Sequence, residues 1–198
     1  MDIESEDTVV LVRQAQLGLP SSMGCLAERA RQRLYAYVYR LTLNRDLAQD
    51  QLQETLLKMV QRISEVKHPE RFWAWLFRTA LGNVQHYYRD EAKREGIAFS
   101  ALMRQRMEEY LSGDYEDGLD RAIRREMSRA VVKALARLPF SYRHVLMLRC
   151  SEQMSFAEIA EMMHCSELHA RVLFFRARNS LGRQLRRRGF DEDLLVQH

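Results

Sequence analysis

Apolar residues recur at helical spacing along most of the chain. The clearest stripe follows Asp46, where one side of the predicted helix carries Ala48, Leu52, Thr55, Leu56, Met59 and Ile63. A helix that packs one side against a core needs such a stripe. The chain has only 8 glycines and 3 prolines to interrupt its elements. The pattern therefore predicts an all-α fold.

The glycines and prolines also give the helix boundaries. Gly18 and Pro20 separate the first two helices. Pro69 suits the first turn of a fourth helix, because an N–H there would have no helical partner. Pro139 disfavours the α conformation of the residue before it and so ends a helix. The predicted helices cover residues 7–17 and about 22–43, begin at 46 and at 69, and cover about 119–138 and 139–149.

Charge divides the chain into three parts. Residues 1–95 carry 14 basic and 13 acidic side chains, residues 96–120 carry 2 and 6, and residues 121–198 carry 15 and 8. The middle part mixes glycine, serine and acids, as linkers do. We expect two small helical domains, 1–95 and 119–198, joined by a flexible acidic linker over 96–118 with room for a helical turn around 101–110.

Two short helices around a tight turn are predicted near the end of the second domain. Ser155 and Glu158 match the capping-box pattern. Residues 164–166 can form the turn, with Ser166 as the cap of the last helix. The buried side of that helix would carry Ala170, Leu173, Phe174, Ala177, Leu181 and Leu185. This arrangement is a helix-turn-helix, whose second helix enters a DNA major groove.

The last helix carries charge of one sign. From Leu168 to Phe190 there are seven arginines and no carboxylate. Cations on a helix are usually offset by acids three or four residues away, so the imbalance indicates a polyanionic partner, DNA. Residues 186–188 should neutralise phosphates, whereas side chains near the amino end should read bases. The expected readers are His169, Arg171, Val172, Phe175 and Arg176.

Three surfaces admit more than one interpretation. Val172 and Phe175 are either ordinary exposed apolar residues or contacts for thymine methyl groups. The third helix has a second face, opposite its apolar stripe, that is either exposed to solvent or a binding surface. This face consists of Asp50, Gln53, Glu54, Leu57 and Gln61. The fourth helix can point Trp73, Phe77, Val84 and Tyr88 to a core. Another face of this helix carries Trp75, Arg78, Gly82, His86 and Arg89. These side chains either pack in the core as well or form a platform on which single-stranded bases stack.

Several classes of protein are not indicated. Three cysteines without a C-x-x-C spacing argue against a disulfide framework, the acidic amino terminus argues against a secretory signal, and no apolar run has membrane-spanning length. We expect a soluble cytoplasmic protein with no membrane insertion. Glycine-rich phosphate loops and protease or hydrolase motifs are absent from the sequence, so no enzyme, cofactor or small-molecule substrate is expected. His164, Cys165 and His169 lack a fourth nearby donor, so no metal is expected.

Taken together, the motifs resemble those of bacterial sigma factors of the extracytoplasmic-function group, over about residues 7–188. The family's first-domain patterns are matched by Ala48-Gln-Asp-Gln-Leu-Gln-Glu54 and by Trp75-Leu-Phe-Arg-Thr-Ala80. Its second-domain patterns are matched by Leu138-Pro139 with Arg143 and Leu146-Met-Leu-Arg149, by Glu158-Ile-Ala160 and by Arg176-Ala-Arg178. Glu-Ile-Ala occurs in many helix-turn-helix proteins, but all these patterns together in the right order are strong evidence.

The resemblance implies a transcription initiation factor that directs core RNA polymerase to promoters and aids their melting. The polymerase clamp coiled coil would bind Asp50, Gln53, Glu54, Leu57 and Gln61. The melted minus-ten strand would contact the loop 64–71 and the helix that follows it. The residues expected to make these contacts are Lys67 and Arg71 in the loop and Trp75, Arg78, Asn83, His86 and Arg89 in the helix. The second domain would seat on the polymerase flap and bind the minus-thirty-five duplex through Ser166, His169, Arg171, Val172, Phe175, Arg176, Arg178 and Arg183. The acidic linker would thread the RNA exit path.

The sequence departs from the family pattern at several positions. Gly82 stands where the family has Asn, with Asn83 one residue later, and His164 replaces the usual turn glycine. His169, Ala170 and Leu173 also differ from the common residues, so we expect an unusual promoter preference. An anti-sigma factor is a further possible partner. The alternative function is a helix-turn-helix repressor or activator that acts on duplex DNA without polymerase, which would need neither the polar stripe nor the aromatic helix of the first domain.

Overall fold

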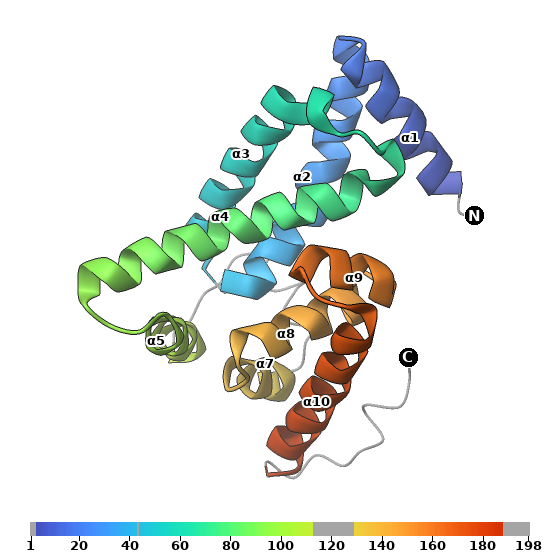
Figure 1. Ribbon diagram of the computed structural model, residues 1–198. Coiled ribbons are helices and arrows are strands. Elements are labelled where there is room, and N and C mark those ends of the chain that lie inside the picture. Colours follow the sequence, from blue (N-terminus) through green and yellow to red (C-terminus); the bar gives the residue numbers. More distant parts are fainter. Residues whose placement is uncertain (1–2, 43, 113–128, 188–198) are drawn as a thin grey trace. The chain divides into compact units, whose positions relative to one another are not determined.

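The computed structural model describes residues 3–42, 44–112 and 129–187 (Figure 1). Every regular element in these ranges is helical, as the apolar periodicity predicts. The chain divides into two compact units, residues 1–90 and 91–198, and each has its own buried apolar residues. The all-α fold class is therefore confirmed.

The described part of the first unit is a set of packed helices. Its elements are α1 (Ile3–Gln16), α2 (Pro20–Thr42), α3 (Arg45–Arg62), two single 3-10 turns (Ile63–Glu65 and Pro69–Arg71) and α4 (Phe72–Glu95), whose end extends into the second unit. Helices α1 and α3 both pack against α2. Pro69 opens the second 3-10 turn, which continues directly into α4, so the predicted role of Pro69 at a helix start is confirmed.

The core of the first unit contains most of the expected apolar residues. On α3, Ala48, Thr55 and Met59 are fully buried. From α4, Phe77 meets Tyr37 of α2 edge to face, with ring centroids 4.8 Å apart. Trp73 differs from the expectation that it points to the core, because it is only half-buried. Its ring packs near those of Phe72 and Phe77, and the guanidinium of Arg33 lies over it at 4.3 Å, so a cation–π contact adds to the apolar packing.

The described part of the second unit ends in the predicted helix-turn-helix. Its elements are α5 (Phe99–Ser112), α7 (Arg129–Ala136), α8 (Phe140–Leu146), a π-helical turn (Met147–Ser151), α9 (Phe156–Met163) and α10 (Glu167–Arg186). Helix α10 packs against α7, α8 and α9. Ala170, Ala177, Leu181 and Leu185 of α10 are buried, while Leu173 and Phe174, expected on the same side, are half-buried.

The region predicted to be a flexible linker is partly a helix. Residues 99–112 form α5, which is longer than the single turn expected around 101–110. Leu102 and Met103 are buried, and Arg106 donates to the carboxylate of Glu91 at 2.6 Å, so α5 has an apolar side and a charged anchor. The boundary between the units also falls after Asp90 rather than after residue 95. Residues 113–118 of the predicted linker lie outside the described residues.

A buried histidine in α8 makes the second unit sensitive to acid. His144 is 2% exposed, and burial lowers the pKa of its imidazole from 6.5 to about 3. The ring is therefore neutral in the folded protein at pH 7 and below it. In the unfolded chain the same ring takes up a proton near pH 6.5, so stability is full above that pH and falls as the pH drops toward 3.

We expect the free energy of unfolding to fall by about 2 kcal/mol between pH 7 and pH 5 because of His144. Urea unfolding of the full chain at the two pH values, followed by circular dichroism, measures the change. His144→Leu should remove most of this pH dependence, and His86→Leu, at an exposed histidine, should leave it in place. An unchanged slope in His144→Leu would contradict the assignment.

Candidate nucleic-acid interface

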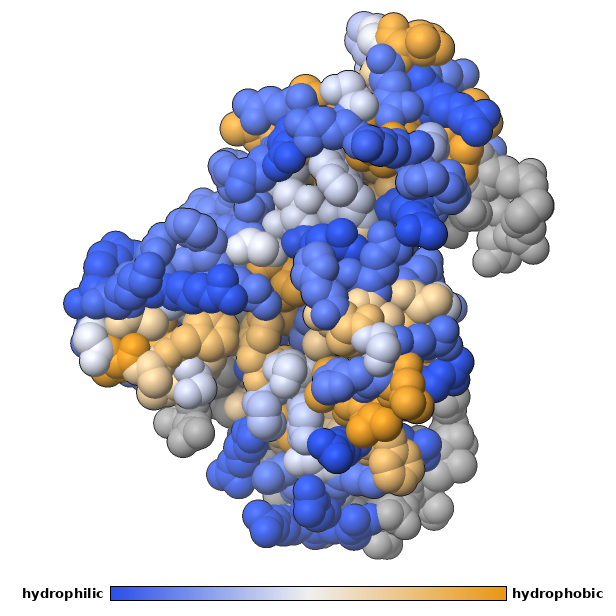
Figure 2. Space-filling model, viewed as in Figure 1, coloured by the Kyte–Doolittle hydropathy of each residue, from blue (hydrophilic) through white to orange (hydrophobic). Residues whose placement is uncertain are grey.

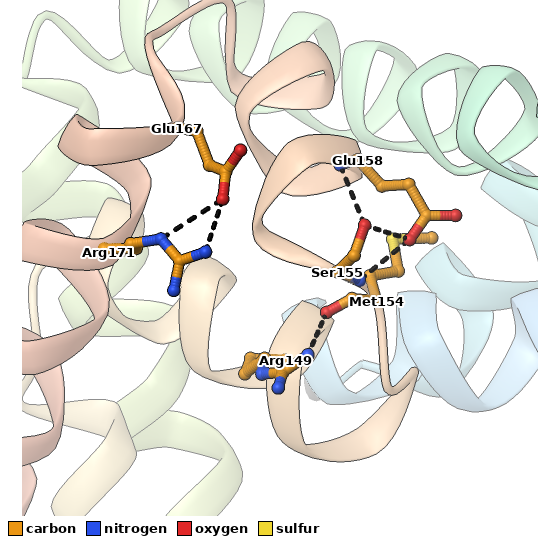
Figure 3. Close-up of polar contacts among 6 residues, drawn as sticks. All are labelled: Arg149, Met154, Ser155, Glu158, Glu167 and Arg171. Carbon is orange, nitrogen blue, oxygen red and sulfur yellow. Dashed lines mark hydrogen bonds and ion pairs between the residues drawn. The ribbon is translucent and has the colours of Figure 1, made fainter.

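The helix-turn-helix is defined by two side-chain caps and one left-handed residue. Figure 3 shows the first of these caps, at Ser155. The hydroxyl of Ser155 accepts from the N–H of Glu158 at 3.2 Å, and the carboxylate of Glu158 accepts from the N–H of Ser155 at 2.7 Å. The predicted capping box is thus confirmed. His164 ends α9 with φ 52°, the conformation that favours glycine, and Ser166 then accepts from the N–H of His169 at 3.2 Å. These contacts fix where α10 begins.

Most of the side chains predicted to contact duplex DNA lie exposed on α10. His169, Arg176, Arg178 and Arg183 are exposed, as are Val172 (40% of its surface) and Phe175 (64%). Ser166 is also exposed, although its oxygen already caps the helix. A hollow beside the helix is lined by Tyr142, Arg171, Val172, Phe175, Arg176, Asn179, Arg183 and Arg186. Hydrophilic residues cover most of the face drawn in Figure 2, with smaller apolar areas among them.

Tyr142 and Leu168 belong to this surface although they were not predicted as contacts. Tyr142 comes from α8, and only the packing of α8 on α10 brings it to the hollow. Leu168 is 72% exposed on the first turn of α10. Its position four residues before Val172 could have indicated a shared face.

Arg171 is the exception to the one-signed charge of α10. Its Nε and Nη2 donate to Oε1 of Glu167 at 3.2 and 2.5 Å (Figure 3). The guanidinium also lies 4.7 Å from the ring of Phe156, whose other neighbours include the guanidinium of Arg149 at 4.9 Å. Because Glu167 precedes Leu168 by one residue, a count that starts at Leu168 omits the acid that pairs with the first arginine.

The polar stripe of α3 forms a continuous exposed face. Asp50, Gln53, Glu54, Leu57 and Gln61 are all exposed. Leu57 exposes 52% of its surface and Val60, which was not predicted, exposes 50%. Glu54 pairs with Lys58 at 3.1 Å, a side-chain pair one turn apart. The face therefore combines carboxylates and amides with two apolar side chains, a composition suited to a protein partner.

The second predicted surface of the first unit joins a loop to the exposed side of α4. Lys67 and Arg71 are exposed in the loop, His86 and Arg89 are exposed on α4, and Trp75 and Arg78 are half-buried. His86 lies 2.9 Å from the carboxylate of Asp90. A Cβ added at Gly82 would meet no atom within 4 Å, so the missing side chain leaves open space on this face.

A glutamine that was not predicted holds the loop in place. The side-chain amide of Gln16, on α1, donates to the carbonyl oxygens of Ile63 at 3.0 Å and Val66 at 2.8 Å. These two bonds satisfy backbone groups at the turn after α3, where no helix continues. Nothing in the sequence around Gln16 signals this role, because its partners are about fifty residues away.

Asn83 does not lie on the strand-binding face to which it was assigned. It is 8% exposed, and its amide donates to the hydroxyl of Thr55 at 3.0 Å. Its carbonyl accepts from the ammonium of Lys58 at 2.6 Å. A buried amide pays for its desolvation with hydrogen bonds, and both ends of this one are engaged by α3. Asn83 therefore fastens α4 to α3.

The described residues were also searched for metal sites, disulfides and membrane-spanning helices. Over residues 3–42, 44–112 and 129–187, histidines, cysteines and carboxylates form no cluster that could hold a metal ion. The three cysteines are unbonded to one another. In the same ranges, each helix is too short or too polar to cross a lipid bilayer.

Comparisons with known proteins match both units. Residues 26–94 match the family model of sigma-70 region 2, and residues 122–181 match that of sigma-70 region 4. The chain is 25% identical over 175 residues to the ECF RNA polymerase sigma-E factor of Haemophilus influenzae, covering 86% of this chain and 91% of that protein. It is 24% identical over 188 residues to the RNA polymerase sigma-H factor of Pseudomonas aeruginosa, covering 92% and 96%.

Two solved structures share the fold. One is CnrH in complex with the cytosolic domain of CnrY, with a TM-score of 0.65, 22% identity and coverage of 91% of this chain and 97% of that one. The other is the sigma factor RpoE in complex with the anti-sigma factor NepR from Bartonella quintana, with a TM-score of 0.59, 20% identity and coverage of 79% and 92%.

Replacing Asn83 should destabilise the first unit. Asn83→Ala leaves the Lys58 ammonium and the Thr55 hydroxyl without this partner, so we expect a loss of about 1–3 kcal/mol in the free energy of unfolding. His86→Ala, at an exposed position on the same helix, should change it by less than about 0.5 kcal/mol. Chemical denaturation monitored by tryptophan fluorescence gives both values. Equal stability of the two variants would show that Asn83 has no fastening role.

Proposed function

The chain belongs to the sigma-70 family, in its extracytoplasmic-function group, and from that membership we propose which of its surfaces carries out each step of promoter recognition. It is a transcription initiation factor that binds core RNA polymerase and promoter DNA. Such factors are not enzymes in the usual sense. Two observations support the assignment of surfaces: residues 26–94 and 122–181 match regions 2 and 4 of the family, and most of the residues assigned to each surface are exposed.

The exposed stripe of α3 binds the clamp coiled coil of the largest polymerase subunit. Asp50 and Glu54 supply carboxylates one turn apart, and Gln53 and Gln61 supply amides. Leu57 and Val60 each expose about half of their surface, so burying them against the polymerase would contribute favourable free energy to binding. An interface of this kind has an apolar centre and a polar rim that fixes the register.

The loop 64–71 and the outer side of α4 hold the melted minus-ten strand. Lys67, Arg71 and Arg89 supply positive charge for phosphates. Trp75 is half-buried and lies 6.2 Å from the ring of Phe72, so its ring is held firmly while part of it stays open for stacking. Binding energy gained by a base outside the duplex then favours strand opening. Asn83 takes no part, because Lys58 and Thr55 occupy it.

Helix α10 binds the minus-thirty-five duplex with its amino end in the major groove. The exposed residues His169, Val172, Phe175 and Arg176 face the base edges, and Arg183, Arg186 and Arg187 contact the backbone. Val172 and Phe175 suit thymine methyl groups. A free-standing repressor would have this helix but no use for the two faces of the first unit, so that alternative is not favoured.

Regulation by a protein partner fits the same family. Of the two solved structures named above, one holds CnrH in complex with the cytosolic domain of CnrY, and the other holds the sigma factor RpoE in complex with the anti-sigma factor NepR. We propose that an anti-sigma protein also binds the present chain and covers the surfaces that bind polymerase and DNA. It acts in the cytoplasm, where bacterial polymerase and promoters are found.

Reversing two charges on the stripe should abolish polymerase binding. The double variant Asp50→Lys and Glu54→Lys places cations where the clamp meets anions, and we expect at least a hundredfold loss of affinity for core polymerase, about 2.7 kcal/mol. The matched control is Glu28→Lys with Glu65→Lys, which changes the net charge equally at exposed positions of the same unit. Binding is measured with fluorescently labelled full-length protein. Unchanged affinity in the first variant would refute the clamp assignment.

Arg176 of α10 and Arg187, the residue that follows this helix, should differ in their effect on DNA binding. Arg176→Ala should relax sequence preference at one position of the minus-thirty-five element, by about tenfold, because a bidentate base contact is lost. Arg187→Ala should weaken binding evenly across sequences and reduce the slope of affinity against salt by about one ion. Holoenzyme binding to a promoter library at several salt concentrations separates the two. Identical effects of both substitutions would mean that the reading face lies elsewhere.

A further inference from the structure

Glu167 is the single carboxylate of α10, a helix that also carries five arginines. It occupies the first residue of the helix, at the end that enters the groove under the proposed function. A carboxylate so close to phosphates weakens DNA binding of every sequence, unless it gains something from the right one. The first turn of a helix does favour an acid, but this preference gives no reason for the contact that Glu167 makes with Arg171.

That contact leaves one acceptor and one donor group unused. Both hydrogen bonds from Arg171 go to the same oxygen, Oε1 of Glu167, so Oε2 stays open in the described structure. On the arginine, Nε and Nη2 are engaged and Nη1 is not. The side chains of Glu167 and Arg171 remain 47% and 56% exposed, so a partner can reach both of them. The ring of Phe156 lies 4.7 Å from the guanidinium and limits its movement.

We propose that Glu167 reads a cytosine in the minus-thirty-five duplex, with its carboxylate accepting from the exocyclic amine, while Arg171 at its side donates to a guanine of a neighbouring base pair. The inference rests on the proposed function, because it needs the amino end of α10 in the major groove. A hydrogen-bonded carboxylate and guanidinium present their open edges a few ångströms apart, which matches the 3.4 Å step between base pairs.

The base edges explain why cytosine is selected. In the major groove cytosine offers an amino donor at N4, whereas guanine and thymine offer acceptors that repel a carboxylate. Adenine offers a donor at N6, but its neighbouring N7 is an acceptor, so a carboxylate fits it less well. A glutamine at the same place has both a donor and an acceptor, which suits adenine N6 and N7. The residue type at 167 therefore determines which base is preferred.

The contact with Glu167 also orients Arg171 for binding to guanine. A guanidinium held by Glu167 and Phe156 has less rotational freedom to lose on binding, so its contact with guanine is pre-organised. Glu167 also disfavours sequences without the cytosine, because its charge then faces acceptors or phosphates with no compensating bond. Both effects sharpen the difference between promoters rather than increase affinity for DNA in general.

The test is selection by holoenzyme from a promoter library randomised through the minus-thirty-five element, followed by sequencing. For the natural chain we expect one position to prefer cytosine by about tenfold and a neighbouring position to prefer guanine. Glu167→Gln should shift the first position from cytosine to adenine, and Glu167→Ala should remove its preference. Arg171→Ala should remove the guanine preference and keep the cytosine. Glu161→Gln, which removes one carboxylate from α9, is the matched control and should alter neither position.

Three results would overturn the inference. If Glu167→Gln and Arg171→Ala changed the same position only, Glu167 would merely position the arginine. If Glu167→Gln raised binding evenly for all sequences, the carboxylate would act only by repelling phosphates. If the natural chain showed no preference anywhere in the element, the proposed function of α10 would fail, and the role of Glu167 with it. The control variant and the melting temperature of each protein identify any loss of fold.

Discussion

The burial of one side of each helix is the constraint on which the functional surfaces depend. On α10, Ala170, Ala177 and Leu185 are buried, and burying such apolar side chains supplies up to about 3 kcal/mol for the larger ones. Since residues of a helix keep fixed angular positions, this burial decides that the arginines face outward. The same holds on α3, where buried Ala48 and Met59 leave the polar stripe exposed. Each proposed partner surface lies on the side of a helix opposite its buried apolar residues.

Cations in this protein serve two different purposes. Some are engaged within the fold, such as Arg33 over the Trp73 ring and Arg149, which donates to the carbonyl oxygen of Met154 at 2.7 Å. Others are exposed, including Arg176 of the last helix and Arg187 directly after it. Only the second kind is suited to replacing the counterions of DNA, and that replacement makes binding depend on salt. A count of basic residues therefore overstates the charge available for DNA.

Polar side chains join elements that apolar packing alone would leave less well defined. Lys58 and Thr55 of α3 bind Asn83 of α4, so the proposed polymerase face and the proposed strand-binding face belong to helices that are bonded to each other. Gln16 fixes the turn from which the loop 64–71 continues. Buried hydrogen bonds are directional, and they specify one arrangement where apolar contacts would tolerate several. The two faces are thus held in a constant relation within the first unit.

The sequence by itself determined what depends on neighbours along the chain. Helical spacing, the proline at residue 69, the capping box of Ser155 and Glu158 and the cap at Ser166 were all predicted correctly, because each involves residues within one or two turns. The exposed stripe of α3 followed from the same periodicity. Tertiary structure alone decided the rest. Asn83 was assigned to the wrong face because its partners are 25 and 28 residues away. Residues 99–112 form a helix in which Leu102 and Met103 are buried and Arg106 pairs with Glu91, and none of these contacts follows from the local pattern. Contacts between distant segments depend on how helices pack, and a one-dimensional pattern does not contain that geometry.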